Sequence, residues 1–166
     1  MSLYVVYMSQ NHLIFEQILN LFNWINREFE SEMYLMKKKI ILTIAFAISL
    51  LPMLLNQYGG MKGVQEISGL INLYNPIGII SVLFFIIGVW IPFKNKKINK
   101  IFGGLGVVGI VISEIYNFFT WHIMNITGKM SIHNSIEFAF PEFYVGLVIS
   151  SIMIAVYFCI DKIVKE

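Results

Sequence analysis

The longest apolar stretch of the chain is residues 101–124, which read IFGGLGVVGIVISEIYNFFTWHIM. It contains one acidic residue, Glu114, and neither lysine nor arginine. A helix needs roughly 20 mostly apolar residues to cross a hydrocarbon core of about 30 Å. This stretch meets that requirement without help from its flanks, so it predicts a transmembrane helix.

Three shorter apolar runs accompany this stretch, and each is bordered by lysines or aromatic residues that can extend it to the membrane interfaces, as Tyr58 would at the outer interface after the first run. The four runs predict spans at about 40–58, 76–93, 101–124 and 143–160. Asn75-Pro76 and Pro141-Glu142 are typical helix starts, whereas Pro52 inside the first run predicts a kink. The predicted fold class is an all-α integral membrane protein, a four-transmembrane-helix antiparallel bundle at residues 36–166.

The composition supports a membrane protein and excludes several other classes. Hydrophobic residues make up 57% of the 166-residue chain and charged residues only 13%, with a mean hydropathy of +0.73. Soluble domains carry about 25% charged residues, so a soluble enzyme, a nucleic-acid binder and a disordered protein are all disfavoured. The single cysteine, Cys159, excludes an internal disulfide and a multi-cysteine zinc site. We expect the protein to lie in a lipid bilayer and to use no cofactor. The abundance of Ile, Asn and Lys suggests a bacterial source.

The basic residues predict the orientation of the bundle. Ten of the twelve lie on one side of the predicted spans: Arg27, Lys37, Lys38, Lys39, Lys94, Lys96, Lys97, Lys100, Lys162 and Lys165. The loops on the other side contain Lys62 and Lys129. Because short loops rich in Lys and Arg stay cytoplasmic, we expect a multi-pass protein of the cell membrane with both termini in the cytoplasm.

Residues 1–35 differ from the rest of the chain. Apolar residues fall on one helical face, with polar residues largely opposite, which predicts an N-terminal amphipathic helix lying at the membrane interface. Its charge is mostly acidic, so docking on a protein is an alternative to binding anionic lipid. A third interpretation is that residues 1–35 are a misassigned extension, since Met36 followed by three lysines is a natural start.

Glu114 is the one acidic or basic side chain placed deep inside a predicted span, and Asn117 lies on the same helical face. An intramembrane carboxylate costs at least about 2.5 kcal/mol, so it must face protein or water. One hypothesis is a proton or cation site at Glu114 and Asn117. The alternative is a structural hydrogen bond to a serine on a neighbouring helix, for which the candidates are Ser49, Ser81, Ser150 and Ser151.

The outer side of the bundle carries a second group of candidates: His122, His133, Glu137 and Glu142. These four could form a polar cluster, but their spacing does not specify a metal site. No catalytic set is predicted, since membrane proteases of the aspartyl type need two aspartates at membrane depth and Asp161 is the only aspartate.

Three functions remain open. The first, which the lack of catalytic sets and the long outer loops favour, is a non-enzymatic accessory, immunity or partner-binding subunit that contacts another membrane protein or a second copy of itself. The second is a small proton- or cation-coupled transporter that uses Glu114. The third is a membrane enzyme acting on lipid at the outer interface.

Overall fold

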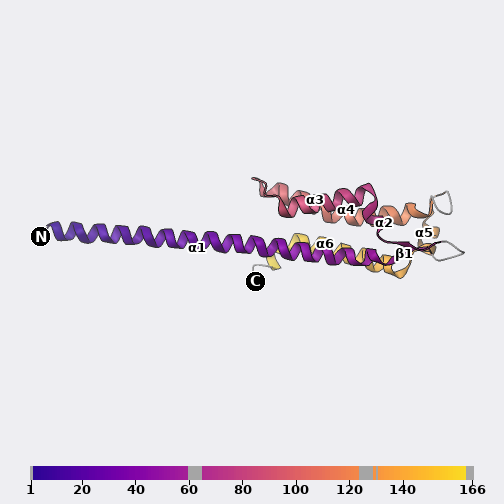
Figure 1. The fold of residues 1–166 in the computed structure, drawn as a ribbon, viewed down its shortest axis with the longest axis horizontal. Helices are drawn as coiled ribbons and strands as arrows, with labels where there is room; N and C mark the ends of the chain where they lie inside the picture. Colours follow the sequence, from indigo (N-terminus) through magenta and orange to yellow (C-terminus); the bar gives the residue numbers. More distant parts are fainter. Residues whose placement is uncertain (1, 60–64, 124–128, 130, 164–166) are drawn as a thin grey trace. The chain divides into compact units, whose positions relative to one another are not determined.

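The structure is a computed structural model that describes residues 2–59, 65–123, 129 and 131–163. The described chain is mostly helical (Figure 1), which confirms the all-α fold class in its coarse form. It divides into two compact units, Met1–Lys38 and Lys39–Glu166. We describe each unit by itself.

The first unit consists of the N-terminal part of helix α1, Ser2–Leu50. Among its described side chains, apolar and polar residues alike are exposed, including Trp24 at 56% and Phe29 at 68%. The helix is continuous across Met36, so the expected boundary between an interfacial helix and the first span is not marked by a break in secondary structure. The association of this segment with a membrane interface remains a prediction.

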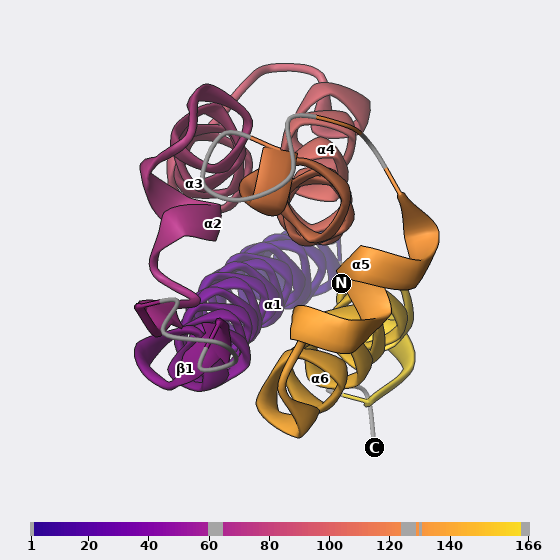
Figure 2. The same ribbon diagram turned by 90° about the vertical axis from the view of Figure 1, so that its right-hand side faces the viewer.

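The second unit contains the end of α1 and all other described elements. These are η1 (Leu51–Leu54), β1 (Asn56–Tyr58), β2 (Ile67–Ser68), α2 (Ile71–Tyr74), α3 (Pro76–Trp90), α4 (Lys96–His122), α5 (Ile132–Phe138) and α6 (Pro141–Ile163). Helices α3 and α4 lie side by side as a hairpin, and α6 also packs on α4 (Figure 2). Within the described residues, α4 and α6 are long and apolar enough to cross a membrane, and α3 is a shorter apolar helix. This supports membrane association.

The outer part of the first predicted span is not helical. Helix α1 ends at Leu50, and Pro52 lies in the first turn of the 3₁₀ helix η1. Since proline has no N–H to donate and clashes with the preceding turn, the α-helix stops here instead of kinking. The chain then continues as β1, which pairs antiparallel with β2, and Tyr58 also forms a bridge to Ala139. The predicted span at 40–58 is therefore wrong in its last residues.

The predicted helix starts are confirmed. Asn75 is the N-cap of α3: its side chain accepts a hydrogen bond of 2.8 Å from the Gly78 N–H, and Pro76 occupies the first helical position. Pro141 likewise begins α6. The capping side chain satisfies one of the free N–H groups in the first turn of the helix. Proline at the first helical position has no N–H that would need a partner.

The helices of the second unit pack closely around an apolar core. Phe46 of α1 stacks on Phe85 of α3 with ring centroids 3.8 Å apart. Helices α3 and α4 approach each other closely at two glycines, since a Cβ built on Gly88 would clash with the backbone of Gly103. Small residues at a helix crossing allow the two backbones to come this close.

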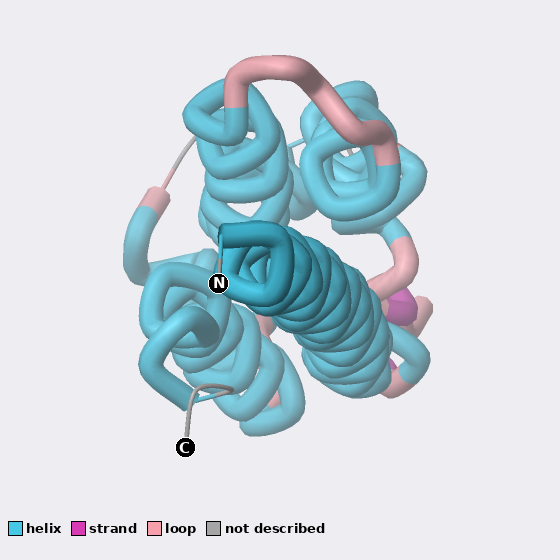
Figure 3. Tube along the Cα trace, turned by 90° about the vertical axis from the view of Figure 1, so that its left-hand side faces the viewer, coloured by secondary structure: helices cyan, strands magenta, loops and turns pink. Residues whose placement is uncertain are grey.

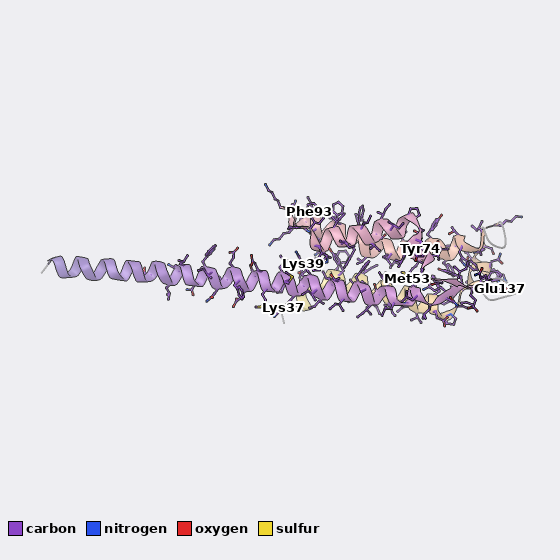
Figure 4. The ribbon with its side chains drawn as sticks, in the orientation of Figure 1. Lys37, Lys39, Met53, Tyr74, Phe93 and Glu137 are labelled. Carbon is purple, nitrogen blue, oxygen red and sulfur yellow. The ribbon has the colours of Figure 1, made fainter. Side chains whose placement is uncertain are left out.

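Basic residues and the loop between α3 and α4 mark one end of this unit. Figure 3 shows that loop as a pink tube, and Figure 4 places Lys39 and Phe93 towards the same end, with Glu137 at the opposite end. Lys39 also lies over the Trp90 ring, 5.8 Å from its centroid. Lys62 and Lys165 lie outside the described residues.

Candidate functional site

Buried polar side chains gather between β1, α2 and α4, and Asn72 of α2 is at their centre. Its amide nitrogen donates to Gln57 Oε1 at 2.9 Å, and its Oδ1 accepts from Asn117 Nδ2 at 2.8 Å. Gln57 Nε2 in turn donates to the Pro52 carbonyl at 3.3 Å. Gln57 and Asn72 are 0% exposed. These bonds connect the strand after α1 to the C-terminal part of α4.

A second branch of this cluster fixes the start of α3. Ser113 of α4 donates from its hydroxyl to the Asn72 carbonyl, and accepts a 2.6 Å hydrogen bond from Asn75 Nδ2. The same Asn75 caps α3 through its Oδ1. We call Gln57, Asn72, Asn75, Ser113 and Asn117 the amide network. The hydrogen bonds among its members explain why polar groups can be buried here, since each bond satisfies groups that would otherwise be unpaired.

Glu114 lies next to the amide network in sequence but is bonded elsewhere. It is 0% exposed, and its Oε1 accepts a 3.1 Å hydrogen bond from the Ser150 hydroxyl of α6. Its second oxygen, Oε2, has no hydrogen-bond partner among the described residues. Ser150 is one of the four serines that the sequence offered as partners.

The energetics of Glu114 favour a bound positive charge. A buried ionised carboxylate costs several kcal/mol, and one hydrogen bond from a neutral hydroxyl returns about 1 kcal/mol. Ser150 alone therefore does not offset the cost of a charge at this position. The carboxyl group must be neutralised, either by a proton or by a bound cation.

Gly146 of α6 lies close to both the carboxyl group and the amide network. A Cβ built on Gly146 would lie 3.1 Å from Gln57 Nε2 and 3.6 Å from Glu114 Oε1. These two atoms thus border the same glycine. A larger residue at position 146 would contact both of them.

Tyr58, the residue after Gln57, is also completely buried. Its side chain is 0% exposed, and its hydroxyl makes no hydrogen bond of normal geometry to a described residue. The ring packs against Trp121 and Phe143, with centroids 5.2 and 5.5 Å away.

The structure separates the two residues of the predicted inner site. Glu114 and Asn117 are both buried, but Asn117 bonds to Asn72 rather than to the Glu114 carboxyl. Sequence reasoning missed Gln57, Asn72 and Ser113, and took Tyr58 for an interfacial anchor. The available signal was the presence of amides at positions 57, 72 and 75 between apolar runs, although nothing in the sequence pairs them with α4.

The predicted outer cluster is not assembled as a set. His122 is 0% exposed at the end of α4, whereas the side chain of His133 is 88% exposed on α5. His133 and Glu137 do form an i,i+4 pair, with His133 Nε2 3.9 Å from Glu137 Oε2, a pair that the sequence interpretation overlooked. Across the described part of the chain, no three His, Cys, Asp or Glu side chains are placed to hold a metal ion.

Comparison with protein-family models, with curated proteins and with solved structures found no match to this chain. The functional argument therefore rests on its own residues. Of these, Glu114 carries a fully buried oxygen, Oε2, that has no hydrogen-bond partner among the described residues.

Proposed function

We propose that the protein is a small multi-pass membrane protein that takes up and releases one positive charge at Glu114, as a proton- or cation-coupled transporter would. The observation that carries this proposal is the fully buried Glu114 carboxyl, which has one oxygen without a hydrogen-bond partner among the described residues. The neighbouring amides, by contrast, are held by bonds to one another. An ionisable group inside a membrane segment is a functional candidate in its own right.

The proposed activity is non-enzymatic. The charge of the Glu114 site limits which ions can bind there. Lysine and arginine are absent from α3, from the part of α4 after Lys100 and from α6 before its last turn. A single carboxylate at this depth is neutralised by one positive charge, whereas a divalent ion would leave an uncompensated charge in a poorly solvated site. The occupant is therefore a proton or a monovalent cation.

The proposed topology has four spans, formed by α1 from Lys39 onwards, α3, α4 and α6, with both termini in the cytoplasm. It is supported by the position of Lys39 and the α3–α4 loop at one end of the second unit, because basic ends remain in the cytoplasm (Figure 4). The apolar lengths of α4 and α6 agree with it.

Cysteine labelling in intact cells tests this topology. In a Cys159→Ser background, a cysteine at exposed position 133 should react with a membrane-impermeant maleimide, and one at exposed position 97 should react only after the cells are opened. Equal labelling of both positions in intact cells would contradict the four-span arrangement.

The charge-transfer proposal is tested in proteoliposomes that carry a pH-sensitive dye inside. An imposed cation or proton gradient should drive dye-reported flux through the wild-type protein, and Glu114→Gln should abolish this flux. Glu32→Gln, at an exposed glutamate of the first unit, is the matched control and should transport as the wild type does. Undiminished flux through Glu114→Gln would refute the proposal.

A second candidate function is the accessory or partner-binding subunit. The observation that favours it is the first unit, residues 1–38, where several large apolar side chains are exposed, Leu21, Trp24 and Phe29 among them. Native mass spectrometry after gentle extraction distinguishes the two. A reproducible heteromeric complex that is lost when residues 1–35 are removed would support the accessory role, and a clean homo-oligomer would count against it.

A further inference from the structure

Four lysines lie close together in the chain where α3 connects to α4. Lys94 is in the connection, and Lys96, Lys97 and Lys100 are in the first two turns of α4. All four are exposed. Residues three and four apart on a helix are neighbours, so Lys100 lies beside both Lys96 and Lys97. We call these four residues the lysine patch.

Side-chain hydrogen bonds hold the backbone that carries the lysine patch. Asn99 donates from Nδ2 to the Gly88 carbonyl at 3.0 Å, and its Oδ1 accepts from the Phe93 N–H at 3.2 Å. The Tyr157 hydroxyl of α6 donates to the Lys100 carbonyl at 3.3 Å. The start of α4 is therefore bonded to α3, to the α3–α4 connection (Figure 3) and to α6.

The charge of the lysine patch is not balanced by the described residues around it. None of the four lysines forms an ion pair with a described residue. Asp161, in the last turn of α6 and one helical turn after Tyr157, supplies a single negative charge at this end. Like charges three or four residues apart on a helix repel each other. A bound anion would relieve this repulsion.

Exposed apolar side chains border the lysine patch. Lys100 Nζ lies 6.0 Å from the centroid of the Phe158 ring, which is 46% exposed. Ile101, the next residue of α4, is 59% exposed. Lys39 has a similar arrangement over the exposed ring of Trp90, at the end of α3. The surface therefore changes from basic to apolar within about one helical turn.

We propose that the lysine patch binds the headgroups of anionic phospholipids, and that the apolar side chains beside it contact their acyl chains. An anionic phospholipid matches both halves of this surface, whereas a soluble phosphate would use the lysines alone. Clusters of four or more lysines next to a transmembrane helix attract anionic lipids. This inference rests on the membrane topology of the proposed function, and it does not depend on charge transfer at Glu114.

Native mass spectrometry of the purified full-length protein in a neutral detergent tests the proposal. The protein is titrated separately with phosphatidylglycerol, with phosphatidylcholine of the same acyl chains and with inorganic phosphate. We expect tighter binding of phosphatidylglycerol than of phosphatidylcholine, and no retention of inorganic phosphate. Raising the ammonium acetate concentration should reduce the preference for phosphatidylglycerol, because dissolved ions screen the attraction between exposed charges.

A double substitution locates the binding site. Lys96→Gln/Lys100→Gln removes two charges from one face of α4. Since each lysine near an anionic lipid surface contributes about fivefold in affinity, this variant should bind phosphatidylglycerol about 25-fold more weakly and phosphatidylcholine as before. Lys62→Gln/Lys129→Gln removes the same charge from the predicted outer loops, and this matched control should bind like the wild type. Thermal unfolding without added lipid checks that each variant is folded.

Three results would overturn the lipid site. They are equal affinity of the wild type for the two lipids, wild-type binding of phosphatidylglycerol by Lys96→Gln/Lys100→Gln, and an equal loss in Lys62→Gln/Lys129→Gln, which would assign the preference to net charge. Retention of inorganic phosphate without a lipid preference would assign the lysines to a soluble anion instead.

The flux assay separates this inference from the proposed function. Lys96→Gln/Lys100→Gln should transport in proteoliposomes as the wild type does. Selective binding of phosphatidylglycerol by a protein that shows no flux would leave the lipid site standing and overturn charge transfer at Glu114. Flux that depends on Glu114, without lipid selectivity, would have the opposite meaning.

Discussion

Replacing Asn72 with alanine should destabilise the second unit more than any other single amide substitution in the amide network. Asn72→Ala removes one donor and one acceptor at once, leaving Gln57 Oε1 and Asn117 Nδ2 without their bonds of 2.9 and 2.8 Å. Each orphaned buried group costs about 1–3 kcal/mol. Interhelical hydrogen bonds in membrane proteins average only about 0.6 kcal/mol. The loss of stability expected from this average is therefore smaller than the loss expected from unsatisfied buried groups.

We expect a total loss of about 2–4 kcal/mol, because these groups are completely buried and their alternative partners are few. Reversible unfolding in mixed detergent micelles, followed by tryptophan fluorescence, measures it, with Asn23→Ala at an exposed asparagine of α1 as the control. A double-mutant cycle with Asn117→Ala should show coupling of at least about 1 kcal/mol. A loss below about 0.5 kcal/mol, or additive losses in the cycle, would refute the assignment of Asn72 as the centre of the network.

Three further substitutions test the packing of the helices in the second unit. Gly88→Ala should cost about 1–3 kcal/mol of unfolding free energy, because its Cβ would meet the backbone of Gly103 at 2.1 Å, whereas Gly104→Ala, whose Cβ meets the flexible Phe158 ring at 3.1 Å, should cost less in the same unfolding assay. Thr43→Val should cost less than about 1 kcal/mol of unfolding free energy, because the 3.1 Å hydrogen bond that the Thr43 hydroxyl accepts from Trp90 Nε1 is exposed. A larger loss would show that this hydrogen bond is stronger than its exposure indicates.

The helices of the second unit were predictable because their boundaries depend on local chemistry. Asn75-Pro76 and Pro141 start α3 and α6 as expected, since a cap and a proline act within one helical turn. Two glycines of α4, Gly106 and Gly109, lie where α3 approaches. Apolar length and flanking residues were sufficient for these features.

The irregular segment after α1 was not predictable in the same way. Leu51–Tyr58 is apolar enough to continue a span, yet Pro52 ends the α-helix and the chain turns into η1 and β1. The partner of β1 is β2, and the partner of Gln57 is Asn72, 15 residues further on. Pairings over such separations depend on tertiary packing, which a single sequence does not reveal. For the same reason Tyr58 was interpreted as an interfacial residue, whereas it is completely buried.

The position of Glu114 follows from how irregular backbone is accommodated in an apolar environment. Non-helical segments at membrane depth are tolerated where protein groups satisfy their polar atoms. In the proposed topology β1 is such a segment, and Gln57, Asn72 and Ser113 supply hydrogen bonds around it. These residues also lie next to the part of α4 that carries Glu114. The side chains that satisfy the irregular connection therefore also provide polar groups near the carboxyl group. Substitutions in the amide network should therefore lower the free energy of unfolding. Glu114→Gln should instead reduce the proposed charge transfer with little loss of stability. This difference separates polar groups with a structural role from the group proposed to carry the function.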